Sequence, residues 1–205
     1  MSARPVAPEE LQPKSFAFSD ETMAEARVHV AKYPTGRQQS AVIPLLDLAQ
    51  RQHGGWLPRA AIAYVAELLE MPEVRAFEVA TFYTMFNLAP VGRHLVQVCR
   101  TTPCWLRGSD ELTVACKKHL GVGLGETTED GQFTIVEVEC LGACVNAPMV
   151  QINDDFFEDL DAEKMVGLLD ALKAGRDVKV GPQDPRRQTS APATGLTTLV
   201  ATGES

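Results

Sequence analysis

The sequence has no long apolar run, no excess of basic residues and no cysteine before Cys99. A transmembrane helix needs about 20 consecutive apolar residues, and no segment approaches that length. Residues 1–14 lack the apolar stretch of a secretory signal, so we expect a bacterial chain that stays in the cytoplasm without direct membrane insertion. The formal net charge of −8 leaves no basic surface for phosphate groups, which argues against nucleic acid as a partner.

The cysteines are few and odd in number, which argues against a disulfide framework. Clustered cysteines in a reducing compartment more often hold a metal or perform redox chemistry. Four of the five form two pairs, C-x4-C and C-x3-C, made by Cys99, Cys104, Cys140 and Cys144. Each pair begins where a predicted strand ends, and two neighbouring strands would bring the four sulfurs together. Because four thiolates repel one another, a bound cation or cluster must offset their charge.

Spacing alone leaves two kinds of metal site open. In a [2Fe–2S] cluster each iron takes two thiolates, so each pair would hold one iron, and Gly142 and Ala143 leave room for backbone N–H groups near the sulfides. Structural zinc also takes four thiolates at similar spacing. A thioredoxin-type oxidoreductase is disfavoured because no C-x2-C occurs, and a Rieske centre because neither cysteine loop contains histidine. Cys116 lies in a predicted helix and is expected to be a small buried side chain.

Helical periodicity dominates the chain up to residue 89. Apolar residues recur at helical spacing in four segments, so we expect helices over residues 20–32, 41–52, 58–71 and 72–86. Residues 1–18 contain three prolines and are expected to form an extended arm. The pattern therefore predicts an N-terminal helical bundle domain over residues 19–89.

Alternating, β-rich segments follow residue 90. Strands are expected over residues 94–100, 133–139, 149–153 and 156–158, and helices over 109–120, with Ser109 as the N-cap, and 161–174. Without the short strand at 156–158, the order is β-α-β-β-α, which predicts a thioredoxin-like α/β domain over residues 90–180, so the fold class of the whole chain is α+β. Residues 181–205 are rich in Pro, Thr, Ala and Gly and are expected to form a flexible tail.

The spacing of the two cysteine pairs, with 35 residues between them, resembles the ligand pattern of the thioredoxin-like [2Fe–2S] ferredoxins. Two upstream segments, QRQHGGWLP at 50–58 and EVATFYTMF at 78–86, are similar to signatures of the small [2Fe–2S] subunit of respiratory complex I. That family includes the small [2Fe–2S] subunit of bacterial NADH–quinone oxidoreductase and the 24-kilodalton mitochondrial subunit. The resemblance covers about residues 16–174.

The resemblance implies one [2Fe–2S] cluster, bound by Cys99, Cys104, Cys140 and Cys144. It also implies an electron-transfer subunit of NADH–quinone oxidoreductase that exchanges single electrons with FMN. FMN and NADH would be bound by the partner flavin subunit, and other peripheral-arm subunits of complex I would be further partners, on the cytoplasmic side of the bacterial inner membrane. The same family occurs in NAD-linked formate dehydrogenases and hydrogenases, so a diaphorase subunit is one alternative. A zinc-stabilised scaffold protein is the alternative of another class.

Two further motifs have simpler explanations. The segment GVGLG at 121–125 follows a predicted helix and does not match G-x-G-x-x-G, so we expect no complete NADH or FMN site and no catalytic residue in this chain. An acidic run over residues 154–161 is expected to be a solvated face. Its alternative role is to steer docking to a basic partner.

Overall fold

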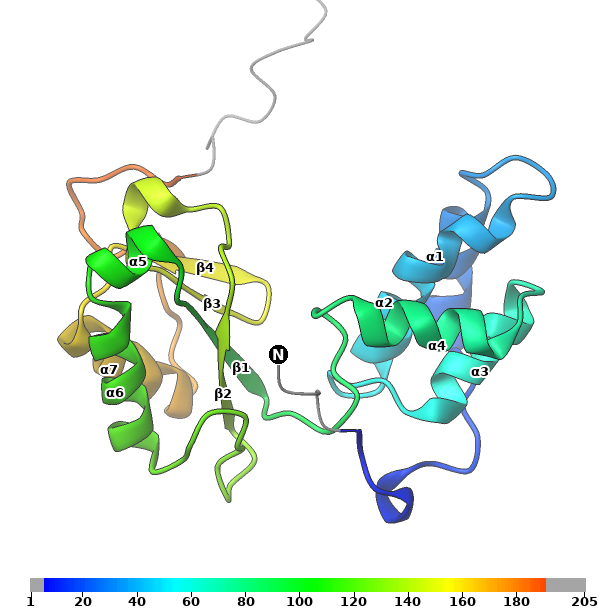
Figure 1. Cartoon of the computed structure of the whole chain (residues 1–205), viewed down its shortest axis with the longest axis horizontal. Coiled ribbons are helices and arrows are strands. Elements are labelled where there is room, and N and C mark those ends of the chain that lie inside the picture. Colours follow the sequence, from blue (N-terminus) through cyan, green and yellow to red (C-terminus); the bar gives the residue numbers. More distant parts are fainter. Residues whose placement is uncertain (1–5, 191–205) are drawn as a thin grey trace, which may run out of the picture. The chain divides into compact units, whose positions relative to one another are not determined.

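The computed structural model describes residues 6–190 (Figure 1). The chain divides into two compact units, Met1–Val91 and Gly92–Ser205. Helices alone make up the regular structure described in the first unit, and a sheet with helices makes up the second. None of the described helices is both long enough and apolar enough to cross a bilayer.

The four helices expected from the apolar periodicity are present in the described part of the first unit. They are α1 Asp20–Val30, α2 Val42–Gln52, α3 Arg59–Leu68 and α4 Glu73–Phe82, with two short 3-10 turns, η1 Glu9–Leu11 and η2 Gln38–Ala41. Helix α3 packs against both α2 and α4. Their apolar faces share one core, in which Leu45, Leu46, Ile62 and Phe86 are almost fully buried.

Side-chain hydrogen bonds join the two segments that carried the family resemblance. The Gln50 side chain donates to Met85 O (3.0 Å) and accepts from Asn87 N (2.7 Å). The Asn87 side chain in turn donates to Gly55 O (2.8 Å), and Leu57 N donates to Asn87 O (2.7 Å). Because the chain must extend after Phe82 to reach these partners, α4 ends four residues before the predicted boundary.

The structure differs from the expected extended arm. Within the described residues 6–18, Ala7 is buried and its N–H donates to Leu88 O (2.8 Å). The rings of Phe16 and Phe18 pack edge-on against Tyr64, with centroids 5.7 and 5.2 Å away. The prolines suggested an arm without core contacts, but the aromatic side chains bind this segment to the helical core.

The strands and helices expected in the second unit are present, and the structure adds α5 (Thr102–Leu106) and β5 (Gly181–Pro182). The described elements of this unit are β1 His94–Cys99, α5 Thr102–Leu106, α6 Ser109–Leu120, β2 Phe133–Val138, η3 Cys144–Asn146, β3 Val150–Ile152, β4 Asp155–Glu158, α7 Ala162–Lys173 and β5 Gly181–Pro182. They form a five-stranded sheet in the order β2-β1-β3-β4-β5. Strand β1 pairs parallel with β2 and antiparallel with β3.

Helices α6 and α7 pack against each other and lie together beside the sheet (Figure 1). Leu112 of α6 and Met165 of α7 share a core with Val96, Val98 and Ile135 from β1 and β2. These alternating strand residues point to one face, as a half-buried strand requires. The inner strand β1 is therefore held by its neighbours on both edges and by both helices.

Two local predictions for this unit are wrong, and one short helix was not predicted. Ser109 does not cap α6: Gly108 is the N-cap with left-handed backbone (φ 99°), and Ser109 is the buried first residue of the helix. A short helix, α5, occupies the loop between the first cysteine pair. Residues 181–190 are not a free tail, because β5 pairs parallel with β4. The rest of the expected tail, residues 191–205, lies outside the described residues.

We expect Gly92→Ala to destabilise the chain, because a Cβ at this position would lie 2.7–2.9 Å from backbone atoms of Phe133. Gly92 N also donates to Thr134 Oγ1 (2.6 Å), so the backbone has little freedom to retreat. The free energy of unfolding should fall by about 1–3 kcal/mol in urea titrations. The matched control is Gly167→Ala on the exposed face of α7, where a Cβ meets nothing within 4 Å. That change should stabilise by up to about 1 kcal/mol, and equal effects of the two variants would contradict the packing argument.

Candidate metal centre

The two cysteine pairs lie at the same edge of the sheet. Cys99 is the last residue of β1 and stands opposite Val138, the last residue of β2. Because these strands are parallel, their carboxyl ends meet at one edge, and the loops that follow both strands leave from there (Figure 1). The expected juxtaposition of two neighbouring strands is therefore confirmed.

The first pair is buried. Cys99 and Cys104 are each 1 % exposed, and α5 turns the chain so that their thiols hydrogen-bond. Burial raises the pKa of Cys104 to about 12, and the hydrogen bond with Cys99 adds to the rise. Burial also raises the pKa of Cys99, but hydrogen bonds from the Thr101 hydroxyl, the Thr101 N–H and Cys104 outweigh it, so the net pKa is lowered. The pKa values of the two thiols of this pair are therefore shifted in opposite directions.

The second pair is exposed to solvent. The sulfurs of Cys140 and Cys144 are 3.4 Å apart, and Gly142 N donates to Cys140 Sγ at 3.4 Å. Gly142 has left-handed backbone (φ 87°), which points its N–H back toward the sulfur. This bond lowers the pKa of Cys140, and its hydrogen bond with Cys144 lowers it further. The same contact raises the pKa of Cys144, because two charged sulfurs cannot share one hydrogen bond.

The two pairs are linked through Thr101. Its hydroxyl lies 3.5 Å from Cys99 Sγ and also hydrogen-bonds Cys140, so it bridges one sulfur of each pair. The charge of Cys99 contributes to the raised pKa of Cys144, which shows that the pairs are within electrostatic reach. Each pair holds one thiol with a lowered pKa and one with a raised pKa. All four can be thiolates together only when a positive group is bound between them.

Two separate cysteine pairs are the donor set that a two-iron cluster takes, with one pair at each iron. A tetrahedral zinc site needs four ligands around one centre, whereas a [2Fe–2S] cluster needs one pair at each iron. Cys116 lies outside the site: it is fully buried in the core with Leu112, and burial raises its pKa to about 12. The prediction that Cys116 is a small buried side chain is confirmed.

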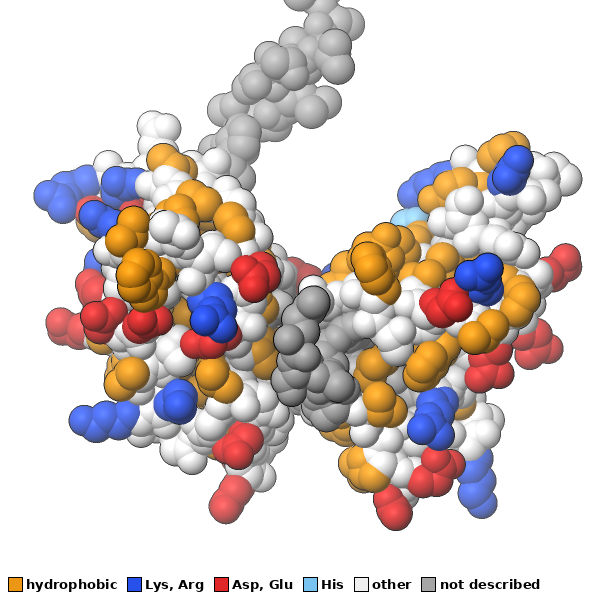
Figure 2. Space-filling view, viewed as in Figure 1, with side chains coloured by type: hydrophobic (Ala, Val, Ile, Leu, Met, Phe, Trp, Pro, Cys, Tyr) orange, Lys and Arg blue, Asp and Glu red, His pale blue; other side chains and the backbone are white. Residues whose placement is uncertain are grey.

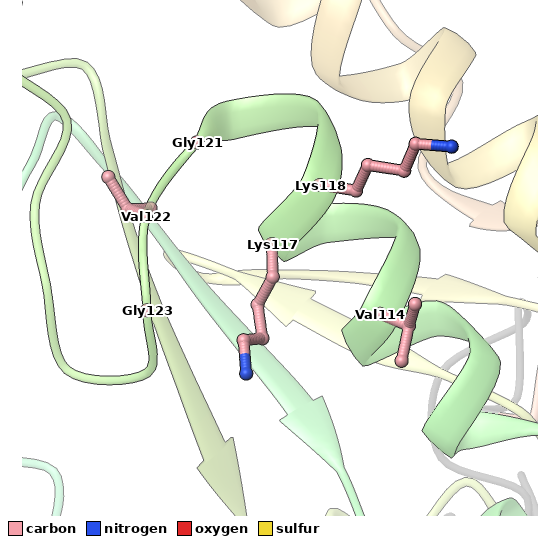
Figure 3. Close-up of a pocket in the computed structure, with 6 residues that line it drawn as sticks. All are labelled: Val114, Lys117, Lys118, Gly121, Val122 and Gly123. Atoms are coloured by element: carbon pink, nitrogen blue, oxygen red, sulfur yellow. The ribbon is translucent and has the colours of Figure 1, made fainter.

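The GVGLG segment is a helix exit, as predicted. Gly121 ends α6 with left-handed backbone, and its N–H donates to Lys117 O at 2.9 Å. An open hollow lies there, and Figure 3 shows Lys117 and Lys118 extending away from each other along its rim. The side chains do not converge on a phosphate, and the segment does not join a strand to a helix as a dinucleotide-binding loop does.

The acidic run over residues 154–161 is not a solvated face throughout. Glu158 is 1 % exposed and accepts a hydrogen bond from Asn146, and Asp159 pairs with Arg187 at 3.0 Å. Asp161 caps α7 by accepting from Lys164 N (2.8 Å). Sequence reasoning missed Asn146 and Arg187; only the position of Asn146, two residues after Cys144, offered a signal.

Comparisons with known proteins find similar sequences over most of the chain. A sequence model of the thioredoxin-like [2Fe–2S] ferredoxins matches residues 26–173. The chain is 58 % identical over 159 residues to the E subunit of NADH-quinone oxidoreductase from Rickettsia bellii, covering 78 % of this chain and 95 % of the relative. It is 53 % identical over 185 residues to NADH dehydrogenase [ubiquinone] flavoprotein 2, mitochondrial, of Dictyostelium discoideum, covering 90 % of this chain and 74 % of the relative.

A solved structure supports the fold. An NAD+-reducing [NiFe]-hydrogenase in the H2-reduced state aligns with a TM-score of 0.57 and 22 % identity. The alignment covers 65 % of this chain and 23 % of the hydrogenase chain. At that identity the likeness concerns the fold alone.

Thr101→Val should lower the reduction potential of the iron-loaded chain. The hydroxyl donates to sulfur, and such bonds stabilise the added negative charge of a reduced cluster. Loss of one hydrogen bond of about 1 kcal/mol corresponds to a shift of roughly 40 mV for one electron. A redox titration followed by EPR measures it, with Thr102→Val as the neighbouring control. An unchanged potential in Thr101→Val would show that the hydroxyl does not act on the sulfurs.

Proposed function

Because the chain belongs to the thioredoxin-like [2Fe–2S] ferredoxin family, we propose that it is the electron-transfer subunit of an NADH–quinone oxidoreductase. The observation that carries the proposal is the meeting of two cysteine pairs at the carboxyl ends of β1 and β2. The 58 % identity to the Rickettsia bellii relative, over nearly the whole length of that protein, supports the choice of complex.

In this proposal the buried Cys99 and Cys104 hold one iron, and the exposed Cys140 and Cys144 hold the other. The bound cluster supplies a carrier for one electron at a time. The chain itself supplies hydrogen bonds to sulfur from the Thr101 hydroxyl and Gly142 N, and it excludes water from the first pair. The exposed pair marks the side on which an electron partner must approach.

The partner of the exposed pair is proposed to be a flavin subunit that binds FMN and NADH. Apolar side chains surround the cysteine loops: Trp105 and Leu106 are 56 % and 70 % exposed, and Val145, next to Cys144, is 70 % exposed. Figure 2 shows hydrophobic side chains gathered over the α5 region. Exposed apolar residues beside a redox centre are what a docking surface that excludes water requires.

The helical unit is proposed to be a bundle domain that contacts other peripheral-arm subunits. Val74, Phe82 and Met85 are 61 %, 77 % and 48 % exposed on or just after α4, although they are apolar. These contacts would keep the chain in the peripheral arm, on the cytoplasmic side of a bacterial inner membrane. Of the four parts expected from the sequence, we retain two as proposed domains, the bundle (19–89) and the ferredoxin domain (90–180), because residues 6–18 pack on the first unit and β5 pairs with β4 in the second.

We expect the chain, purified anaerobically, to contain about two irons and two acid-labile sulfides and to give an S = 1/2 EPR signal after dithionite reduction. Serine at any one of Cys99, Cys104, Cys140 or Cys144 should abolish or alter the signal, because each removes a thiolate ligand. Cys116→Ser, in the core of α6, is the matched control and should leave it unchanged.

Zinc without an EPR signal, before and after reconstitution with iron and sulfide, would favour the scaffold function over electron transfer. If the cluster is present but the copurified partners include a formate dehydrogenase or hydrogenase subunit, the diaphorase alternative replaces complex I.

Leu106→Ser combined with Val145→Ser should weaken copurification with the flavin subunit while cluster content stays unchanged. Both side chains are 70 % exposed beside the cysteines, so replacing them should weaken partner binding without disturbing the core. Truncating a side chain that anchors an interface typically weakens the binding free energy by more than about 1 kcal/mol. A loss of about 1.4 kcal/mol corresponds to a tenfold weaker affinity. Val114→Ser on α6, 63 % exposed, is the control. Equal retention of the partner by both variants would place the interface elsewhere.

A further inference from the structure

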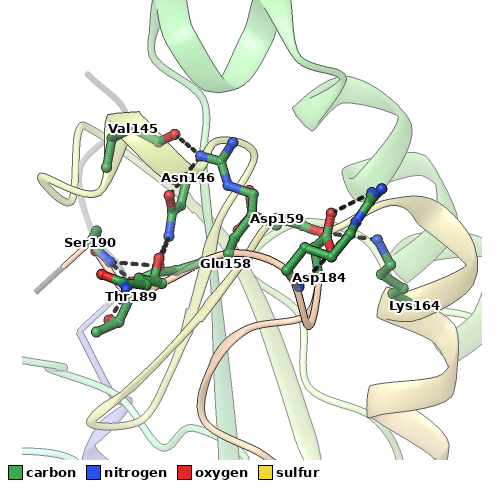
Figure 4. A network of polar contacts seen from close by, with 11 residues as sticks. Val145, Asn146, Glu158, Asp159, Lys164, Asp184, Thr189 and Ser190 are labelled. Carbon is green, nitrogen blue, oxygen red and sulfur yellow. Dashed lines mark hydrogen bonds and ion pairs between the residues drawn. The ribbon is translucent and has the colours of Figure 1, made fainter. Parts of the chain in front are cut away.

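Residues 183–190, here called the C-terminal strap, run back to the loop that carries Cys144 (Figure 4). The strap follows β5, and Gln183 N donates to Glu158 O at 2.8 Å. At its other end, Ser190 N donates to Glu158 Oε2 at 3.0 Å. Between these points, Gln188 O accepts from the Asn146 side chain at 2.7 Å. The strap is therefore bonded both to the sheet edge and to the η3 turn.

Arg187 makes the direct contact with the backbone beside Cys144. Its Nη2 donates to Val145 O (2.5 Å) and to Asn146 Oδ1 (2.8 Å). Its Nε pairs with Asp159 Oδ1 at 3.0 Å, and the Asp159 side chain is only 8 % exposed. Asp159 N also donates to Asn146 O (2.8 Å). One guanidinium thus holds the peptide that follows Cys144 and is itself fixed by a buried carboxylate.

Glu158 also binds the η3 turn. Its carboxylate accepts from Asn146 Nδ2 (2.5 Å) and from the Ser190 hydroxyl (2.5 Å). A carboxylate that is 1 % exposed needs such partners, because burying it without hydrogen bonds is costly. In Figure 4 the Asn146 side chain points into this network, between Glu158 and the carbonyl of Val145.

Cys144 lies outside the sheet. It begins the three-residue turn η3, outside every strand of the sheet, and it is exposed to solvent. Cys99, by contrast, belongs to the inner strand β1 and is buried. Ligands of a metal centre bind well only when surrounding groups fix their geometry. The residues that flank the turn, Ala143 and Ala147, pack in an apolar cluster with Cys99 and Met149. The side-chain hydrogen bonds to the turn come from the strap and from the end of β4.

We propose that Arg187 is a positioning residue that, from the C-terminal strap, holds the Cys144 loop in the geometry required for cluster binding; this rests on the proposed function. Arg187 does not touch the sulfur. It acts through Val145 O and Asn146, so its loss should loosen the turn and leave the buried cysteine pair in place.

The test compares Arg187→Met with Arg186→Met. Arg186 is the matched control, because it is 87 % exposed and pairs with Asp184 within the strap. In the metal-free chain, the rate at which iodoacetamide alkylates Cys144 is measured by mass spectrometry. In the iron-loaded chain, the EPR line shape and the rate of cluster loss to a chelator are measured.

We expect Arg187→Met to raise the Cys144 alkylation rate and to broaden the EPR signal. Cluster loss should be about tenfold faster, which is the lower end of the effects seen when a residue that supports a metal ligand is removed. Arg186→Met should match the wild type. Arg187→Lys should fall between, because lysine keeps the charge but loses the planar fork. If Arg187→Met fails to fold by circular dichroism, Arg187→Lys carries the same comparison.

Identical behaviour of Arg187→Met and Arg186→Met in all three measurements would overturn the proposal. A wild-type chain that takes up no iron and sulfide would instead overturn the proposed function. The alkylation rates need no cluster, so they would still decide whether Arg187 orders the Cys144 loop.

Discussion

The parallel pairing of β1 with β2 is the constraint on which the rest of the second unit depends. Parallel neighbours cannot be joined by a tight turn, so a long crossover is required between them. Here α5 and α6 occupy that crossover. Helix α6 covers the sheet, and α5 folds Cys104 back toward Cys99. The same pairing that requires the crossover also places the end of β1 beside the end of β2, and thereby brings the two cysteine loops together.

The four thiols at that edge differ in pKa. Hydrogen bonds from Thr101 and Gly142 lower the pKa of Cys99 and Cys140, while the remaining thiol of each pair keeps a raised pKa. Because metal ligands must be deprotonated, binding a positive group at this edge would release protons from the thiols whose pKa is raised, Cys104 and Cys144.

The structural features that depend on periodicity and spacing could be predicted from the sequence. The four helices, the four main strands and the cysteine edge follow from patterns that act over a few residues, and the structure has them. Contacts across long sequence distances were missed. Residues 6–18 were judged by their prolines, although Phe16 and Phe18 reach Tyr64. The acidic run was judged by its charge, although the partners of Glu158 lie near residues 146 and 190.

The two halves of the site are stabilised in different ways. This difference explains why the strap could not be predicted from the sequence. The Cys99 half draws on the sheet ladder and on apolar packing with Ala147 and Met149, which leave a periodic signature. The Cys144 half has no ladder, so polar contacts must replace it, and each works only if every partner is present. Such a network imposes no period on the sequence. It joins single residues from β4, η3 and the strap, which only the folded chain brings together.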